Sequence, residues 1–524
     1  MIKIPKIPDP APLAAGSTVI IAKGIPWDRS YKHVRLFASS GACYNFVLSK
    51  SVWTTTGATT VKNNRVRVPI SEPDLLENAN YITFINSQFA SDFKVHAFIT
   101  NIMYISSTVA EVDYEIDVFQ TYFYNCTLNK CYIERQHIFR SEDRVGVNLL
   151  PEPVNLGTYK QYSTQLHSFN SMMCVLYHTS DQYVPDYYGD VNGFFTGVRI
   201  NVGSIEQIKS IVTDLVSKGQ ENAIIMIQMC PAFCIDNLTG TTLTVDYKKA
   251  FGFTPKNKKM YTYPFCYVHV DDYQGSDRDY YFELVNNSND PTMSFRVRGC
   301  FVGLPTIVTY PLYYNNQDNG DNNNIVTNNF PQCAFSGDSY AQWLNSNKIN
   351  MGAAVTTQAI SALGSMFLAG VGAAATGGAT AGMAATAAGS VVNNGIGLIN
   401  TGITQQASEQ TAKNAPNASH GNLGSSCYNI TYNRNQIAFF VVGCDEDSAK
   451  AADDFMSVYG YTVNKVTNIN TYNRNIWNYC KTRDCNVTGD IAYNAREGIN
   501  AIFNNGVFIW HTNNVGNFDI EGNG

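Results

Sequence analysis

The sequence predicts a mainly β protein with small α+β parts, and three observations lead to this fold class. The 524 residues include 32 Tyr and 28 Phe, and a composition rich in aromatic residues and Asn favours strands joined by turns over helical bundles. Strand-like segments follow one another through residues 17–135. Convincing helical patterns are confined to three stretches of the chain.

The predicted strands are rich in β-branched and aromatic residues. Their sequences are STVIIAKGIPW, YKHVRLF, RVRVPI, YITFIN, VHAFITNIMYI and AEVDYEIDVFQTYF. Within residues 17–135, only the short segment Glu72–Ala79 is expected to be helical. Acids alternate in the last strand, at Glu111, Asp113, Glu115 and Asp117. This alternation predicts a two-faced strand with a solvated edge rather than a catalytic pair, because any chain with 42 acids contains close pairs.

Three helices carry recognisable start and stop signals. Ser204–Lys218 has Ser204 as its cap, a stripe of Ile, Val and Leu, and Gly219 at its end. The apolar run that follows it, AIIMIQM, predicts a buried strand. Asp445–Tyr459 has acids in its first turn, which favours a helix start there. Ala492–Asn504 places Ile499, Ile502 and Phe503 on one face.

The most informative segment lies between Lys348 and Glu409, where there is no Asp, Glu, Lys, Arg or His. Val355–Ala375 is about long enough to span a bilayer, which takes ~20 residues in a helix. Ala379–Ile403 is a weaker second candidate, and Ala375–Thr380 is a predicted hinge. An apolar surface of this size must be shielded by partners, by its own fold or by a membrane.

We therefore predict a membrane-active loop with a small-xxx-small packing motif, which lets helices approach closely in lipid. The apolar positions of the loop are Val355, Ile360, Leu363, Met366, Phe367, Leu368, Val371, Met383, Val391, Val392, Ile396, Leu398, Ile399 and Ile403. The small residues are Ala374, Gly378 and Gly382. Large side chains are sparse, which fits a triggered inserter better than a permanent anchor. A flexible loop or a tightly packed internal helical pair accounts for the same composition.

The sequence contains no recognisable motif for catalysis or metal binding. None of its eight His forms HExxH, and there is no GxSxG, P-loop or papain-like cysteine context. Its 13 Cys contain no CxxC pair and are expected to be reduced core thiols. We therefore expect no enzyme activity and no catalytic, cofactor-binding or metal-binding residue.

Charge and the N-terminal segment restrict the partners. Only 15% of residues are charged, against ~25% in typical soluble domains, which is common where surface is hidden in an assembly. The net charge of −6 argues against a basic nucleic-acid-binding face, although it permits an acidic channel through which DNA slides. Pro5, Pro8, Pro10 and Pro12 argue against a signal peptide and predict an extended arm.

Several motifs carry a family resemblance. They are Gly24-Ile25-Pro26-Trp27-Asp28 with Tyr31, Phe37, Tyr44 and Phe46; Asn80–Phe84; Phe98–Ile102; the block from Asp113 to His137; and the ending NYCKTRDCNVTGDIAYNAREGINAIFNNGVFIWH. The block to His137, which ends in Ile133-Glu134-Arg135-Gln136-His137, is the most specific. Together these motifs resemble the tail-knob, or distal tail tube, proteins of Picovirinae-like short-tailed bacteriophages. Residues from about 160 to 340 show no confident match.

The resemblance implies a structural virion protein assembled in the host cytoplasm. It implies a homohexameric ring of tube-forming β-barrel or sandwich domains whose hydrophobic loops plug the lumen and later perforate the host cytoplasmic membrane. The implied partners are further copies of the chain, other tail proteins, that membrane, and viral DNA passing without sequence-specific binding. A tail-associated cell-wall hydrolase and a receptor-binding adhesin are the alternatives.

The expected organisation has four parts. Residues 1–150 form a β-rich tube domain, and 151–345 form a middle α+β knob domain. Residues 346–415 form the hydrophobic loop, and 416–524 form a C-terminal α+β part that completes the tube.

Overall fold

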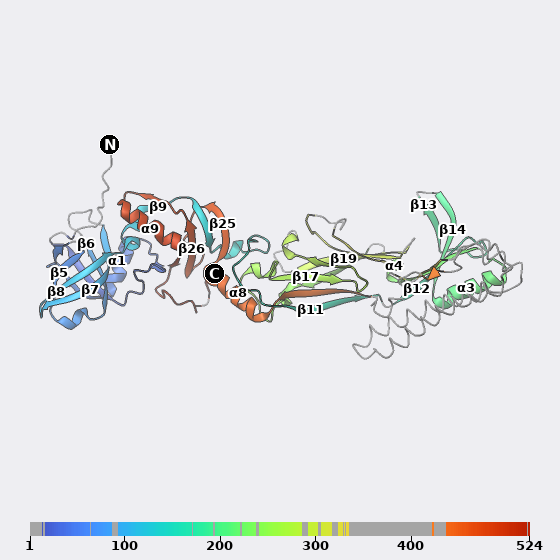
Figure 1. Cartoon of the computed structure of the whole chain (residues 1–524), viewed down its shortest axis with the longest axis horizontal. Helices are drawn as coiled ribbons and strands as arrows, with labels where there is room; N and C mark the ends of the chain where they lie inside the picture. The colour runs from blue at the N-terminus through green and yellow to red at the C-terminus, as the bar shows by residue number, and fades with distance from the viewer. Residues whose placement is uncertain are drawn as a thin grey trace, which may run out of the picture. The chain divides into compact units, whose positions relative to one another are not determined.

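A computed structural model describes most of the chain outside the Ala/Gly-rich region (Figure 1). The described residues are 13, 16–62, 64–85, 93–169, 171–191, 194–220, 223–236, 240–285, 292–301, 305–316, 323–328, 330, 332–334, 422–423, 436–520 and 522–523. Residues 1–12 of the predicted N-terminal arm, with its four Pro, and the whole loop 346–415 lie outside this part of the chain. All predicted membrane-active and small-residue positions belong to this loop, so they also lie outside the described residues.

The described chain packs as two compact units, each assembled from separated segments. Unit 1 comprises Met1–Leu156, Pro255–Met260 and Asp447–Gly524. Unit 2 comprises Gly157–Thr254 and Tyr261–Glu446. The four-part organisation stays a prediction, while the mainly β fold class is confirmed by the sheets of both units.

Unit 1 contains a seven-stranded antiparallel sheet with strand order β3-β1-β6-β7-β8-β5-β4. Its strands are β1 (Thr18–Lys23), β3 (Ser51–Thr55), β4 (Thr59–Lys62), β5 (Arg65–Pro69), β6 (Ala79–Ile85), β7 (Lys94–Ser106) and β8 (Val109–Ile116). Strand β1, which lies between β3 and β6, is buried on both faces, and this explains its unbroken apolar run. Strand β5 instead alternates buried Val with outward Arg.

A second sheet of unit 1 has five strands in the order β2-β28-β26-β10-β25. The strands are β2 (His33–Arg35), β10 (Cys131–Gln136), β25 (Tyr461–Thr467), β26 (Trp477–Arg483) and β28 (Val507–Trp510). Because β2 pairs with β28, the first and last parts of unit 1 are joined through the sheet. A short pair, β9 (Cys126–Leu128) and β27 (Val487–Gly489), links the same two parts of the chain again.

The helices of unit 1 include two that the sequence did not indicate. They are α1 (Ser40–Ser49) and α2 (Val118–Tyr122). The expectation of one short helix at Glu72–Ala79 was wrong in extent, since only a 3-10 turn, η1 (Pro73–Leu76), forms there. Both missed helices contain aromatic residues and lack a long apolar stripe, but each has a side-chain cap, Ser39 or Asp117.

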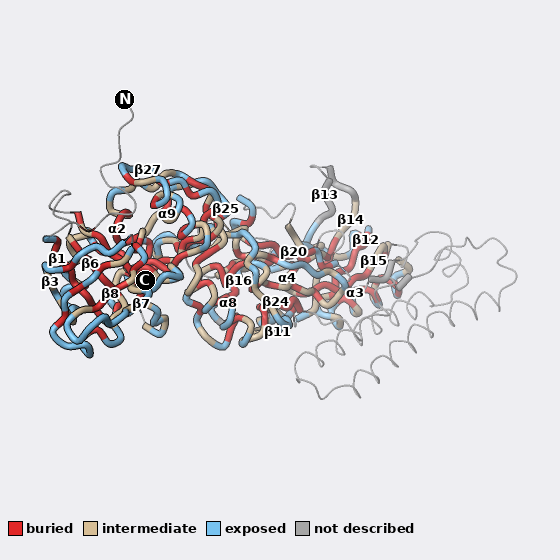
Figure 2. Tube along the Cα trace, turned by 60° about the vertical axis from the view of Figure 1, so that its left-hand side comes forward, coloured by how far each residue is buried: buried red, intermediate tan, exposed pale blue. Residues whose placement is uncertain are grey.

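The predicted C-terminal helices are confirmed as α8 (Glu446–Tyr459) and α9 (Tyr493–Asn505). Ile499, Ile502 and Phe503 of α9 are buried on one face, as the pattern predicted. Buried residues, red in Figure 2, run through the sheets of each unit.

Unit 2 contains two four-stranded antiparallel sheets. One has the order β11-β24-β17-β18, with β11 (Tyr159–Ser168), β17 (Cys266–Asp271), β18 (Asp277–Tyr280) and β24 (Gln436–Cys444). The other has the order β16-β19-β20-β21, with β16 (Thr241–Asp246), β19 (Thr292–Cys300), β20 (Thr306–Pro311) and β21 (Ile325–Thr327). They face each other through Phe439 and Phe295, whose ring centroids are 4.9 Å apart, and Tyr280 packs on Phe295.

A third sheet of unit 2 has the order β13-β14-β12-β15-β22-β23. Its strands are β12 (Met172–His178), β13 (Tyr187–Val191), β14 (Phe194–Gly203), β15 (Ile224–Pro231), β22 (Gln332–Ala334) and β23 (Asn422–Leu423). The predicted helix is confirmed as α3 (Ile205–Ser217), and the predicted buried strand after it is β15. Ile208, Val212 and Leu215 of α3 pack in one apolar cluster with β12 and β15.

Candidate functional site: a buried polar cluster in unit 1

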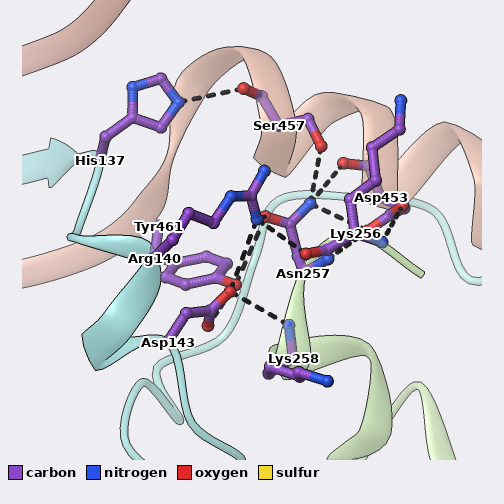
Figure 3. Close-up of polar contacts among 9 residues, drawn as sticks. All are labelled: His137, Arg140, Asp143, Lys256, Asn257, Lys258, Asp453, Ser457 and Tyr461. Atoms are coloured by element: carbon purple, nitrogen blue, oxygen red, sulfur yellow. Dashed lines mark hydrogen bonds and ion pairs between the residues drawn. The ribbon is translucent and has the colours of Figure 1, made fainter. Parts of the chain in front are cut away.

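A group of polar side chains, several of them buried, surrounds the segment Pro255–Met260 in unit 1. The chain on both sides of this segment belongs to unit 2, so the segment is an isolated piece of unit 1. We call the nine residues drawn in Figure 3 the Asn257 cluster. They are His137, Arg140, Asp143, Lys256, Asn257, Lys258, Asp453, Ser457 and Tyr461.

Helix α8 holds one side of the segment through Asp453. The carboxylate of Asp453 accepts the backbone N–H groups of Lys256 and Asn257 at 2.9 and 3.0 Å. The Asn257 amide donates to Asp453 Oδ1 at 2.9 Å, to the Asp453 carbonyl at 2.8 Å and to Ser457 Oγ at 2.8 Å. Asn257 is 1% exposed, so these bonds replace the water that the segment loses on burial.

The region after β10 holds the other side. Arg140 donates to the Lys256 carbonyl at 2.7 Å, and the Lys258 N–H donates to Asp143 Oδ2 at 3.3 Å. Tyr461 of β25 donates its hydroxyl to Asp143 Oδ1 at 2.9 Å. Backbone N–H groups and a backbone carbonyl of the segment are therefore bonded to side chains from distant parts of unit 1.

A buried ionic group continues the contacts toward Lys259. The side chain of Glu152 is 0% exposed and pairs with both Lys259 and Arg135. Lys259 also donates to the Leu150 carbonyl, and Arg135 donates to the Gly460 carbonyl at 2.6 Å. Burial lowers the pKa of Lys259, while Glu152 acts in the opposite direction. Because one buried carboxylate meets two cations, removing it would leave both without compensation.

His137 is a neutral, fully bonded histidine. Its Nδ1 accepts the backbone N–H of Tyr479 at 2.9 Å, which assigns the ring proton to Nε2. Nε2 then donates to the Ser457 carbonyl at 3.0 Å. Burial, reinforced by nearby Arg474, lowers the pKa of His137 to about 3. Since both ring nitrogens are used, His137 orients β10 against α8 and β26 rather than offering a free base.

The pKa values of the two carboxylates of the Asn257 cluster are raised, whereas the pKa of His137 is lowered. Burial raises the pKa of Asp453 and of Asp143 above their usual values. In both cases hydrogen-bond donors offset part of this effect, Lys256 and Asn257 for Asp453, and Tyr461 and Lys258 for Asp143. The hydrogen-bond donors reduce the free-energy cost of burying these two carboxylates, as is typical of a structural polar network.

A second buried acid, Asp117, organises the start of unit 1. It accepts from Trp27 Nε1 at 3.2 Å and from the Tyr81 hydroxyl at 2.7 Å, and it caps α2. Burial raises the pKa of Asp117 to about 6. The expectation of a solvated acidic edge is thus wrong for Asp117 and Glu111, which are buried, whereas Asp113 is partly exposed and Glu115 is exposed. Glu111 and Asp113 pair with Arg67 and Arg65 across the sheet.

Chemically, the side chains of these clusters bond backbone groups and one another. Across the described residues, no group of three or more His, Cys, Asp or Glu could hold a metal ion. The cysteines that the structure describes are free thiols, most of them buried. Burial raises the pKa of Cys480 and Cys266, which disfavours the reactive thiolate.

The sequence motif and the structure meet at this site. Ile133–His137 ends the most specific motif of the resemblance, and its charged side chains have partners: Arg135 and His137 as above, and Glu134 with Lys481 and Arg483 at 2.9 Å each. Sequence reasoning missed Asn257 and Asp453. One signal was present, since Asp453 lies on the apolar stripe of α8 beside Ala449, Ala452 and Met456.

Comparisons with known proteins agree with a structural role in a phage tail. Residues 15–127 match the family model of the caudoviral major tail protein N-terminus. Residues 232–523 match the C-terminal domain model of the Bacillus phage phi29 tail knob protein gp9. The chain is therefore a structural component of a phage tail. Because the second match covers more than half of it, the chain belongs to the phi29 gp9 tail knob family.

Relatives extend the match to nearly the full length. The tail knob protein gp9 of Bacillus phage phi29 is 25% identical, over 97% of this chain and 98% of that protein. Those of phages PZA and B103 are each 24% identical over the same shares. The solved tail knob protein gp12 of bacteriophage C1 shares the fold, with a TM-score of 0.62 at 14% identity, covering 95% of this chain and 97% of that one. The predicted resemblance is confirmed.

Proposed function

We propose that copies of this tail knob protein close into a homohexameric ring at the distal end of the tail tube. We further propose that residues 346–415 plug its lumen and, once released, penetrate the host cytoplasmic membrane to form a channel for the genome. The observation that carries the membrane role is the absence of charged residues and His between Lys348 and Glu409 in a family of tail-tip proteins.

The physical basis is that the lumen of a ring and the interior of a bilayer both remove apolar surface of the segment from water. Six such segments can cover one another's apolar surface inside a ring. Beside a bilayer, the same surface is removed from water by lipid at ~25 cal/mol per Å². Since the two environments are nearly equivalent, a modest trigger suffices to shift the population between them. In the described part of the chain, no helix has the length and hydropathy that a bilayer span needs.

The low charge suits a channel wall. The chain carries a net charge of −6, so its average field repels phosphates. DNA that passes a weakly charged or acidic wall is not held there, because phosphate binding requires Lys and Arg clusters. This supports passage without sequence-specific binding. Contacts with neighbouring tail proteins follow from the place of the knob in the virion.

The test of the membrane role uses the full chain and liposomes. Leu363→Asp, Phe367→Asp and Val371→Asp are combined, because each charge costs ~2.5–3.5 kcal/mol at a membrane centre. We expect this variant to lose dye release that the wild-type protein causes. A matched control adds the same three charges to the Asn-rich segment 314–328, as Asn319→Asp, Asn322→Asp and Asn324→Asp. Equal leakage from all three proteins, or none from any of them across pH and lipid composition, would show that the segment is a plug or a linker.

A further inference from the structure

The β-sandwich of unit 2 has two outer surfaces of opposite charge. The sandwich is formed by the sheet β11-β24-β17-β18 packed on the sheet β16-β19-β20-β21 through Phe439, Phe295 and Tyr280. Because each sheet buries one face in this core, its other face points away from the sandwich. The two outer faces therefore lie on opposite sides of unit 2.

The outer face of the first sheet, which we call the acidic face, combines carboxylates with aromatic rings. Burial alternates strictly along β17, so its half-buried residues share the outer side. On β18, register places Asp277 opposite Asp271 and Asp279 opposite His269. The acidic face comprises Tyr267, His269, Asp271, Asp277, Asp279 and Tyr281.

A row of tyrosines extends the acidic face beyond β17. Tyr263 and Tyr281 have ring centroids 5.0 Å apart, and Tyr159 lies 5.9 Å from Tyr267. Tyr263 is 52% exposed and Tyr159 is 44% exposed. Exposed aromatic rings rimmed by polar groups mark interaction surfaces, and Tyr is enriched at the centres of protein interfaces.

The outer face of the second sheet, which we call the basic face, carries arginines among hydroxyl groups. On β19, buried Met293, Phe295 and Val297 alternate with outward residues. Register places Arg296 opposite Thr242 and Arg298 opposite Val308. The basic face comprises Thr242, Thr244, Thr292, Ser294, Arg296, Arg298, Val308 and Val326, and one carboxylate, Asp246, lies opposite Thr292 at its end. The two arginines also take part in interactions within the subunit, which an interface would share.

We propose that the acidic face of one copy binds the basic face of the next copy of this chain. The inference rests on the proposed ring and names the surfaces that close it. Two different faces on opposite sides of one unit make a heterologous contact, which propagates from copy to copy and closes when the rotation per step allows. Arg side chains suit this contact, because a guanidinium pairs with carboxylates and stacks on aromatic rings.

The experiment follows assembly of the full chain by native mass spectrometry. One variant reverses the acidic face with Asp277→Lys and Asp279→Lys, and another reverses the basic face with Arg296→Glu and Arg298→Glu. Each is expected to weaken association by roughly a hundredfold, because like charges then meet across the interface. The control, Glu206→Lys with Lys209→Glu on α3, keeps the wild-type assembly.

Two mixing results separate this proposal from loss of folding. Combining all four face substitutions restores opposite charges and is expected to restore rings. In an equimolar mixture of the two single-face variants, native and charge-reversed pairings alternate from copy to copy, and we expect rings that contain both variants although neither variant assembles alone. The proposal is overturned if either single-face variant assembles like wild type, or if the combined variant melts like wild type yet stays monomeric. A wild-type chain that is monomeric at high concentration refutes the ring itself, whichever faces are involved.

Discussion

At the scale of single residues, unit 1 shows buried polar groups that are tolerated because each has several partners. Asn257 and Asp453 hold a six-residue segment, Pro255–Met260, whose neighbours in sequence belong to unit 2. Removing one side chain from such a network lowers the free energy of unfolding by more than the average contribution of one hydrogen bond, because the remaining partners stay buried without water. Stability measurements can therefore detect the role of individual side chains.

Asn257→Ala is expected to lower the free energy of unfolding by roughly 2 to 4 kcal/mol. The substitution removes three donor contacts to Asp453 and Ser457 and leaves a buried carboxylate less satisfied. Urea unfolding followed by fluorescence measures the change. Asn514→Ala, at an exposed position, is the control and is expected to have no effect. A loss below about 0.5 kcal/mol for Asn257→Ala would contradict a structural role for the cluster.

His137 gives a pH prediction. Its folded pKa is about 3, against ~6.5 when unfolded. Below pH ~6.5 the unfolded chain binds a proton that the folded chain does not, so this residue makes stability fall as pH falls from about 6.5 toward 3. The amide of Gln can also accept and donate a hydrogen bond but does not titrate. His137→Gln should therefore reduce the pH dependence of the free energy of unfolding by up to ~1.4 kcal/mol per pH unit, which corresponds to one proton.

Unfolding measured from pH 7 to pH 4 in both proteins tests this expectation. Asp143 and Asp453 have raised pKa values and therefore contribute with the opposite sign. Their contribution is present in both proteins and cancels in the difference between them. Identical slopes for wild type and His137→Gln would show that His137 is protonated in the folded state.

At the scale of elements, capping signals in the sequence locate helices well. Helix α3 has a complete capping box: Ser204 Oγ accepts from the Gln207 N–H at 3.3 Å, and Gln207 Oε1 accepts from the Ser204 N–H at 2.8 Å. It ends at Ser217, and Gly219, two residues later, has a φ of 70° that is unfavourable for other residues. Local bonds thus define both ends, and the apolar stripe docks the helix on its sheet.

Ser204→Ala is expected to destabilise unit 2 by about 1 kcal/mol, because the Gln207 N–H in the first turn of the helix loses its acceptor, Ser204 Oγ. Thermal unfolding followed by circular dichroism measures the effect. Ser210→Ala, at an exposed position inside the same helix, should be neutral or slightly stabilising, since Ala has the higher helix propensity. Equal melting of both variants would exclude a contribution from the capping box.

At the scale of the whole molecule, the chain passes repeatedly between units. Unit 1 is completed by residues 447–524, so the long stretch between its first and last parts is largely an insertion that forms unit 2. The parallel pairing of β2 with β28 joins residues near 33 to residues near 510. The solved tail knob protein gp12 of bacteriophage C1 shares the fold over 95% of this chain.

Replacing residues 351–410 with a short Gly/Ser linker should separate assembly from membrane activity. We expect the variant to keep the wild-type oligomeric mass and melting behaviour and to lose dye release from liposomes. Loop-closure entropy grows slowly with length, so a shorter linker costs little if its ends can be joined. Full dye release by the shortened protein would assign membrane activity to another part of the chain.

Much of the fold follows from local patterns. The strands of residues 17–135, the helices α3, α8 and α9, and the absence of catalytic motifs were read from composition, periodicity and caps. The missed helices α1 and α2 show the limit of this approach, because their residues favour strands and only caps and packing make them helical. The family was recognised because its motifs are short, local and specific.

The sequence by itself determined the mainly β class, most element types, the family, and the uncharged character of residues 349–408. Each of these depends on neighbours within a few residues. Tertiary structure alone decided that Asp453 meets Asn257, 196 positions away, and that Asp117 is buried among Trp27 and Tyr81. It also decided which faces of unit 2 point outward. The physical reason is that side-chain pairing across distant segments depends on how sheets pack, which no local period encodes.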